Sequence, residues 1–90
     1  MPYLIICKDK QDSLLLRKKN REKHLKYLKR FESKLIMAGP ILSNSGNPEG
    51  TVIVLDYGNR ENIDKFVNED PYNLVSLFEK VSIHKFKKVF

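Results

Sequence analysis

The two residues best suited to acid–base chemistry in this sequence are His24 and Asp70. A carboxylate that is hydrogen-bonded to one imidazole nitrogen fixes the tautomer of the ring and raises the basicity of the other nitrogen. Asp70 also precedes Pro71. An aspartate before a proline is a typical helix N-cap, a role that needs no catalysis. Both roles of Asp70 are compatible with the sequence.

A stripe of residues that recur every three or four positions places His24 beside two arginines. Its members are Arg17, Arg21, His24, Leu28, Phe31 and Leu35. This spacing puts them on one face of a helix. One half of the stripe is basic and the other is apolar, so we expect the basic half to line a cavity or its mouth. The alternative is a packed, hydrogen-bonded histidine next to solvated arginines.

Turn residues and hydrophobic periodicity divide the chain into alternating strands and helices. A strand is predicted over residues 3–8 and a helix over 17–37, which Gly39-Pro40 would end. The remaining predictions are a short strand from 41–42, a loop over 43–50, a strand over 51–56, a helix capped by Asn59 with Ile63, Phe66 and Val67 on one face, a short helix from Pro71 towards Phe78, and a strand over 81–86.

The predicted order is strand, helix, strand, strand, helix, strand, within one domain over residues 1–90. Two βαβ units of this length form an α+β, ferredoxin-like βαββαβ sandwich, with both helices on one face of an antiparallel sheet. Residues 52–55 are apolar at every position, which indicates burial on both faces of that strand. The helices cover only one face, so we expect a second subunit to cover the other in a homodimer.

The composition argues against several classes of function. The net charge is +6, and residues 17–34 alone carry +7. The run of glycines and aromatics typical of RNA-binding sheets is absent, so we expect no specific nucleic-acid binding. No segment approaches the ~20 apolar residues of a membrane helix. The single cysteine, Cys7, fits a reducing cytoplasm and is expected to be buried.

Metal and cofactor sites are not predicted. His24 and His84 are the only histidines and lie far apart in the sequence, and one thiol cannot form a cysteine cluster. The glycines at positions 46 and 50 fall in a hairpin loop, so no glycine-rich phosphate loop is predicted. We expect no bound cofactor.

Several short segments, in this order and spacing, resemble the YciI-like (YCII-related) family over nearly the whole chain. These segments are Tyr3-Leu4-Ile5-Ile6, Asp12-Ser13-Leu14 followed by Arg17, Arg21 and His24-Leu25, then Ala38-Gly39-Pro40, Gly50-Thr51-Val52, Asp70-Pro71-Tyr72 and Phe86-Lys87-Lys88-Val89-Phe90. The resemblance implies a ferredoxin-like subunit that dimerises into an α+β barrel with a pocket in each subunit.

The resemblance also implies an active site built on His24 and Asp70. It assigns substrate binding to residues around that pair: Ser13, Arg17, Arg21, Gly39, Pro40 and Tyr72. The expected function is that of a small-molecule enzyme, a lyase, isomerase or hydrolase, which uses the His–Asp pair as acid and base. Because guanidinium groups suit carboxylates and enolate-like oxygens, the expected ligand is anionic. The alternative is a ligand-binding or regulatory dimer without turnover.

Overall fold

The chain folds into four strands and three helices. The computed structural model describes residues 1–90. In chain order the elements are β1 (Tyr3–Asp9), α1 (Leu14–Lys29), β2 (Leu35–Leu42), β3 (Pro48–Leu55), α2 (Arg60–Glu69), α3 (Pro71–Leu74) and β4 (Phe78–Lys85).

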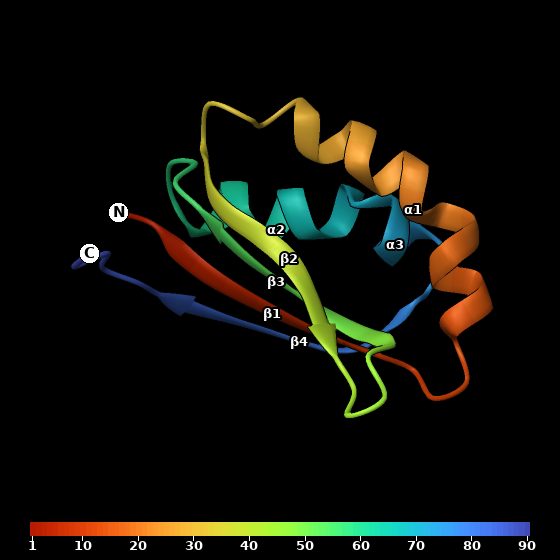
Figure 1. Cartoon of the computed structure of the whole chain (residues 1–90). Coiled ribbons are helices and arrows are strands. Elements are labelled where there is room, and N and C mark those ends of the chain that lie inside the picture. The colour runs from red at the N-terminus through yellow and green to blue at the C-terminus, as the bar shows by residue number, and fades with distance from the viewer.

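The strands form one antiparallel sheet in the order β2-β3-β1-β4. All three helices lie over the same face of this sheet, and no element covers the other face (Figure 1). At the centre, Ile5 of β1 is paired with Ile53 of β3 on one side and Ile83 of β4 on the other. The predicted α+β, ferredoxin-like plan is therefore confirmed, with α3 as a short addition after α2.

The predicted helix over residues 17–37 is wrong at both ends. The helix starts at Leu14 and stops at Lys29; of the residues expected to complete it, 30–34 form turns and 35–37 begin β2. Pairing of residues 35–37 with β3, as in Met37 opposite Val54, outweighs their local helical pattern. Gly39-Pro40 therefore lies inside a strand. Because β2 is an edge strand, it tolerates a proline that lacks an amide hydrogen.

Two other predicted boundaries differ from the structure. The loop predicted over residues 43–50 is shorter, because pairing of Leu42 with Pro48 starts β3 early. The helix predicted from Pro71 towards Phe78 is a single turn that ends at Leu74. Ser76 then adopts a left-handed conformation with φ of 59°, which the helix cannot continue through, and β4 begins at Phe78.

The core lies between the sheet and the helices. The apolar face predicted for α2 is buried there: Ile63, Phe66 and Val67 pack against β1 and β3. The Asn59 side chain accepts a hydrogen bond from the Asn62 amide, which confirms the predicted N-cap of α2. The Tyr27 hydroxyl donates to the Phe66 carbonyl oxygen at 2.7 Å and so fixes α1 against α2.

Strand alternation carries two polar side chains to the helix side of the sheet. Tyr3, Ile5 and Cys7 of β1 are buried under the helices, and Asp9 follows in the same alternation. Thr51 lies opposite Cys7 on the neighbouring strand β3. Both polar residues thus lie beneath the N-terminal half of α1, where the site is built.

Candidate active site

The His24 and Asp70 side chains meet inside the protein. His24 Nδ1 lies 2.9 Å from Asp70 Oδ1, and both side chains are almost fully buried. His24 comes from the middle of α1, and Asp70 stands at the junction of α2 and α3. Asp70 Oδ1 also accepts a hydrogen bond from the Tyr72 amide at 2.9 Å. One carboxylate oxygen therefore both caps α3 and holds the imidazole, so the two roles left open by the sequence occur together.

The hydrogen bond to Asp70 leaves the second imidazole nitrogen free. Because a carboxylate accepts, the proton of a neutral His24 ring lies on Nδ1 and the lone pair lies on Nε2. Nε2 has no hydrogen-bond partner within the chain, and no enclosed side-chain nitrogen or oxygen lacks a partner. Nε2 is therefore open to the cavity that His24 lines. This is the geometry of a general base.

Tyr72 connects the imidazole to Arg17. Its ring stacks on His24 with centroids 4.0 Å apart, and the Arg17 guanidinium carbon lies 4.6 Å from the same ring centroid. Burial raises the pKa of the Tyr72 hydroxyl; Arg17 and Arg21 oppose this shift, whereas Asp70 reinforces it. The hydroxyl is thus a neutral phenol at neutral pH.

The Arg17 guanidinium is held in place by hydrogen bonds to the Asp9 and Thr51 side chains. Its Nε and Nη2 donate to the two carboxylate oxygens of Asp9 at 2.6 and 3.1 Å, and Nη2 also donates to Thr51 Oγ1 at 2.6 Å. Nη1 makes no such bond and, by the same reasoning as for His24, faces open space. Arg17 is therefore a fixed group with one nitrogen left for a ligand, and its charge is largely balanced by Asp9.

These groups line a cavity of about 250 Å³ between α1 and the edge strand β2. Its lining is formed by Arg17, Lys18, Arg21, His24, Leu25, Leu28, Ala38, Gly39, Pro40, Pro48, Thr51 and Tyr72. Arg21 and Lys18 are exposed and bring positive charge to its mouth, and Leu25 and Leu28 supply an apolar wall. Such a cavity, with a few convergent polar groups on an apolar lining, is typical of small-molecule sites.

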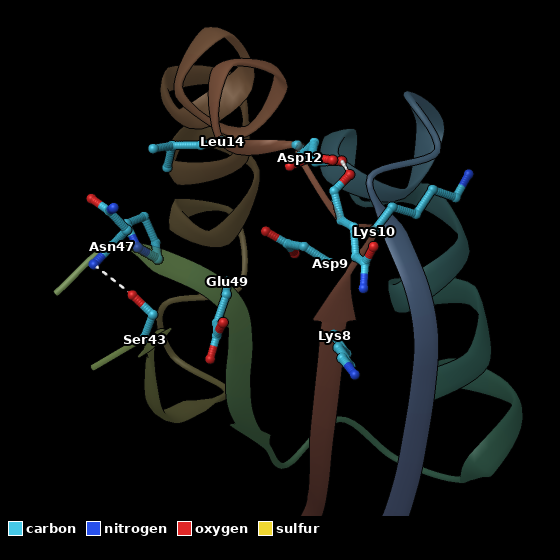
Figure 2. Close-up of a pocket in the computed structure, with 11 residues that line it drawn as sticks. Lys8, Asp9, Lys10, Asp12, Leu14, Ser43, Asn47 and Glu49 are labelled. Carbon is cyan, nitrogen blue, oxygen red and sulfur yellow. Dashed lines mark hydrogen bonds between the residues drawn. The ribbon is translucent and has the colours of Figure 1, made fainter. Parts of the chain in front are cut away.

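Five of the six predicted substrate-binding residues line this cavity, and Ser13 does not. Ser13 instead lines a second cavity of about 480 Å³, between the turn before α1 and the β2–β3 hairpin (Figure 2). Its hydroxyl donates to the Gln11 carbonyl oxygen at 3.3 Å. Ser13 is thus separated from His24 by the Arg17–Asp9 pair.

The predicted stripe shares only Arg17 and His24 with the buried face of α1, and its last members, Phe31 and Leu35, lie beyond the end of the helix at Lys29. The buried residues of α1 are Arg17, Asn20, His24 and Tyr27, and Arg21 lies beside this line rather than on it. Asp9 and Thr51, the partners of Arg17, were not predicted as site residues. The parity of β1 was the available signal for Asp9, because that residue follows three buried positions spaced two apart.

Other reactive groups lie apart from this cavity. His84 is exposed on β4, and no group of three or more His, Cys, Asp and Glu side chains is arranged to hold a metal ion. Cys7 is buried as predicted, and burial raises the pKa of its thiol to about 12. None of the helices is both long enough and apolar enough to cross a membrane.

Relatives with known sequences match the whole chain. A family model for the YCII-related domain matches residues 1–87. Protein YciI from Escherichia coli O6:H1 is 33% identical over 98 residues, which cover 100% of this chain and 100% of that protein. An uncharacterized protein from Haemophilus influenzae is 31% identical over 98 residues, again with 100% of both chains covered.

Solved structures with this fold include an enzyme in complex with a small quinone. The 5-chloro-2-hydroxyhydroquinone dehydrochlorinase TftG from Burkholderia phenoliruptrix, in complex with 2,5-dihydroxybenzoquinone, is 27% identical with a TM-score of 0.94, covering 97% of this chain and 94% of that chain. A conserved protein from Methanosarcina mazei Go1 has 14% identity and a TM-score of 0.60, covering 97% and 94% of the two chains. The second likeness shows the fold alone.

Proposed function

The chain belongs to the YCII-related family, and from its site we propose that it is a small-molecule enzyme in which His24 and Asp70 form the acid–base pair. One observation carries the proposal. His24 is a buried histidine whose Nδ1 is hydrogen-bonded to the Asp70 carboxylate. Its Nε2 faces a cavity and has no hydrogen-bond partner in the chain. A structural histidine in a packed core would have both nitrogens satisfied.

In this mechanism Nε2 takes a proton from the bound ligand. Asp70 keeps the ring in the required tautomer and stabilises the imidazolium that forms. In an elimination, the electron pair of the broken bond to hydrogen forms the new double bond, and the leaving group departs as an anion. Arg17 Nη1 and the Arg21 guanidinium then stabilise the negative charge that develops on a ligand oxygen. The imidazolium returns its proton to the solvent.

The proposed ligand is a small, oxygenated, anionic ring. The Tyr72 ring and the apolar wall of Leu25 and Leu28 suit a planar molecule, and Arg21 and Lys18 suit its negative charge. TftG, which is described as a dehydrochlorinase and binds 2,5-dihydroxybenzoquinone, supports this class of ligand and favours elimination over isomerisation or hydrolysis.

The test is chloride release from 5-chloro-2-hydroxyhydroquinone by the purified protein. We expect turnover by the wild type and a loss of at least 100-fold in His24→Ala, since general-base catalysis contributes roughly 10²–10⁴-fold. Lys23→Ala is the matched control, because Lys23 is the exposed neighbour of His24 on α1 and lies outside the cavity. Full activity in His24→Ala would rule out this mechanism.

The chloride assay, together with a binding measurement, separates an enzyme from a protein that only binds its ligand. If 2,5-dihydroxybenzoquinone binds in a manner that depends on Arg17 and His24, and 5-chloro-2-hydroxyhydroquinone is recovered unchanged, binding without turnover is favoured. The cavity would then serve a ligand-binding or regulatory dimer without turnover.

We further propose that two copies of the chain associate through the face of the sheet that carries no helix. On β1, β2 and β3 the side chains that alternate away from the helices are mostly apolar, no helix lies over them, and they are exposed or half-buried: Leu4, Ile6, Met37, Ile41 and Val52. A face of this kind can be covered by the same face of a second copy, related by a two-fold axis.

The mass in solution tests this association. Sedimentation velocity is expected to give a dimer for the wild type and a monomer for Val52→Lys, which places a charge at the centre of the open face. Asn68→Lys adds the same charge on the exposed side of α2 and is expected to remain a dimer. A monomeric wild type at micromolar concentration would contradict the proposal.

A further inference from the structure

The Thr51 hydroxyl has a hydrogen-bond partner for its oxygen but none in the chain for its hydrogen. Thr51 is 2% exposed and lines the same cavity as His24. Its Oγ1 accepts a hydrogen bond from Arg17 Nη2 at 2.6 Å, because a guanidinium can only donate. This is the only hydrogen bond that the Thr51 side chain makes within the chain, so its hydroxyl hydrogen is free to donate.

The neighbours of Thr51 in the sheet offer this hydrogen no side-chain oxygen. Residues directly opposite each other on paired strands place their side chains on the same face of the sheet. Opposite Thr51 are Cys7 on β1 and Pro40 on the edge strand β2. Neither side chain carries an oxygen, and Pro40 itself lines the cavity. The cavity is therefore the place where an acceptor for this hydrogen can lie.

The contact with Arg17 holds the Thr51 hydroxyl in place and strengthens it as a donor. The branched Cβ of threonine restricts its χ1 angle, and the bond from Nη2 restricts the oxygen further. A hydroxyl that accepts from a charged group is polarised, so its own hydrogen forms a stronger hydrogen bond. Nη1 of the same guanidinium can also only donate. This part of the cavity wall thus presents two donors, which suit a carbonyl oxygen or an oxyanion.

These two donors lie in reach of a ligand that also meets the imidazole. The Tyr72 ring centroid is 4.6 Å from the Arg17 guanidinium carbon and 4.0 Å from the centroid of the His24 ring. Arg17, His24 and Thr51 line one cavity of about 250 Å³. A single small ring in this cavity can therefore present an oxygen to the donors and a hydrogen to His24 Nε2.

We propose that Thr51 is a ligand-binding residue of this site, whose hydroxyl donates a hydrogen bond to a carbonyl or deprotonated oxygen of the ring. This inference rests on the proposed function and deepens it. It selects rings whose oxygen accepts hydrogen bonds at this position over rings that carry only a protonated hydroxyl there, because both Thr51 and Arg17 Nη1 donate.

Binding of 2,5-dihydroxybenzoquinone to Thr51→Val, measured by isothermal titration calorimetry, tests the proposal. Valine has the shape of threonine without the hydroxyl. A hydrogen bond to a charged oxygen is worth a factor of about ten or more in affinity, so we expect affinity to fall at least tenfold. Thr51→Ser is the matched control, because it keeps the hydroxyl and loses only the methyl group, and it is expected to bind like the wild type.

A crystal structure of the wild-type complex separates a donor from a residue that only positions Arg17. We expect a ligand oxygen within about 3 Å of Thr51 Oγ1. A loss of affinity in Thr51→Val without such a contact would mean that Thr51 acts only through Arg17, and the proposal would be wrong. If Thr51→Val shows no cooperative thermal unfolding, the wild-type complex decides alone.

The remaining outcomes separate this inference from the proposed function. Equal affinity in Thr51→Val and the wild type would overturn the role of the hydroxyl and leave the His24 mechanism intact. If the wild type does not bind this compound, the proposed ligand class fails, and a crystal structure of the unliganded wild type decides about Thr51. An ordered water or anion in the cavity within hydrogen-bond distance of Oγ1 would support the inference. An acceptor from the chain in that position, or no neighbour at all, would overturn it.

Discussion

At the scale of single residues, Asp70 joins the site to the backbone. Its Oδ1 accepts from His24 Nδ1 and from the Tyr72 amide, each at 2.9 Å. An asparagine oxygen can accept the same bonds but carries no charge, whereas an alanine can do neither. Substitutions at this one position can therefore separate the capping role from the role in chemistry.

We expect Asp70→Asn to keep most of the stability, because asparagine is an equally good N-cap, and to lower turnover about 100-fold. Asp70→Ala loses the cap and the bond to the imidazole, at a combined cost of about 2–4 kcal/mol. Asn59→Ala removes only the N-cap of α2 and should cost about 1 kcal/mol with unchanged turnover. Urea denaturation and the chloride assay measure these effects, and equal stability of Asp70→Ala and wild type would contradict them.

The Arg17–Asp9 pair provides a second prediction at this scale. Removing one partner of a buried ion pair costs about 3–5 kcal/mol, because the other charge stays buried and unpaired. Asp9→Ala is therefore expected to lower the free energy of unfolding by about 3 kcal/mol. The matched control is Asp64→Ala, which breaks the exposed Arg60–Asp64 pair and should cost less than about 1 kcal/mol. Similar losses in both variants, by urea denaturation, would show that Asp9 is not needed to balance Arg17.

The sequence predicted the residue types of the site better than their partners. The spacing on α1 places His24 near Arg17, because that spacing is local. The contact with Asp70 joins residues 46 positions apart, and only the family resemblance suggested it. The Arg17–Asp9 contact depends on how β1 lies under α1, which no local pattern reports.

At the scale of elements, β2 shows where local patterns fail. Residues 35–37 continue the periodicity of α1, yet they pair with β3. Helix propensities differ by less than about 1 kcal/mol per residue, so a ladder with a neighbouring strand can override them. The boundaries set by side-chain capping, such as Asn59 and Asp70, were predicted correctly because those caps act within three residues.

Gly50 lets β3 approach both neighbouring strands. A Cβ at this position would lie 2.5 Å from the Cys7 carbonyl oxygen, whereas a Cβ at Gly39 would meet nothing within 4 Å. We expect Gly50→Ala to lower the free energy of unfolding by about 1–3 kcal/mol, the usual cost of overpacking, and Gly39→Ala to change it little. Thermal unfolding followed by circular dichroism compares the two variants. An unchanged unfolding temperature in Gly50→Ala would mean that β1 shifts without cost.

At the scale of the whole molecule, the sequence predicted the strand and helix order and hence the sheet topology. This order depends on hydrophobic runs and turn residues, which are spread along the chain and tolerate errors in individual boundaries. The cavity could not be predicted in the same way, because its walls come from α1, β2, β3 and α3. Its shape depends on how these elements pack, which the family resemblance conveyed only as an expectation.

Two buried groups of the core, the Cys7 thiol and the Tyr27 hydroxyl, make the fold less stable at alkaline pH. Burial raises the pKa of the Cys7 thiol from 9.0 to about 12, and burial also raises the pKa of the Tyr27 hydroxyl. The unfolded chain loses these protons at lower pH than the folded chain. Their contribution is therefore complete below about pH 9 and is lost as the pH rises towards 12.

We expect the free energy of unfolding, measured by urea denaturation, to fall steadily between pH 9 and 11. Cys7→Ala should be less stable than the wild type at pH 7, because it leaves a small cavity, but should lose less stability over this pH interval. An equal loss in both proteins would show that the thiol does not contribute to the pH dependence.

The oxygen shared by His24 and the Tyr72 amide also gives the protein a built-in spectroscopic reporter. A proton arriving at the imidazole draws charge from Asp70 Oδ1, and the amide hydrogen on the same oxygen is deshielded less as a result. In a ¹⁵N–¹H correlation spectrum, the Tyr72 cross-peak should follow the ionisation of His24 without any label on the ring. The chemical shift of the Tyr72 amide thus reports the charge on His24, and ligands that change this charge can be screened by this single cross-peak.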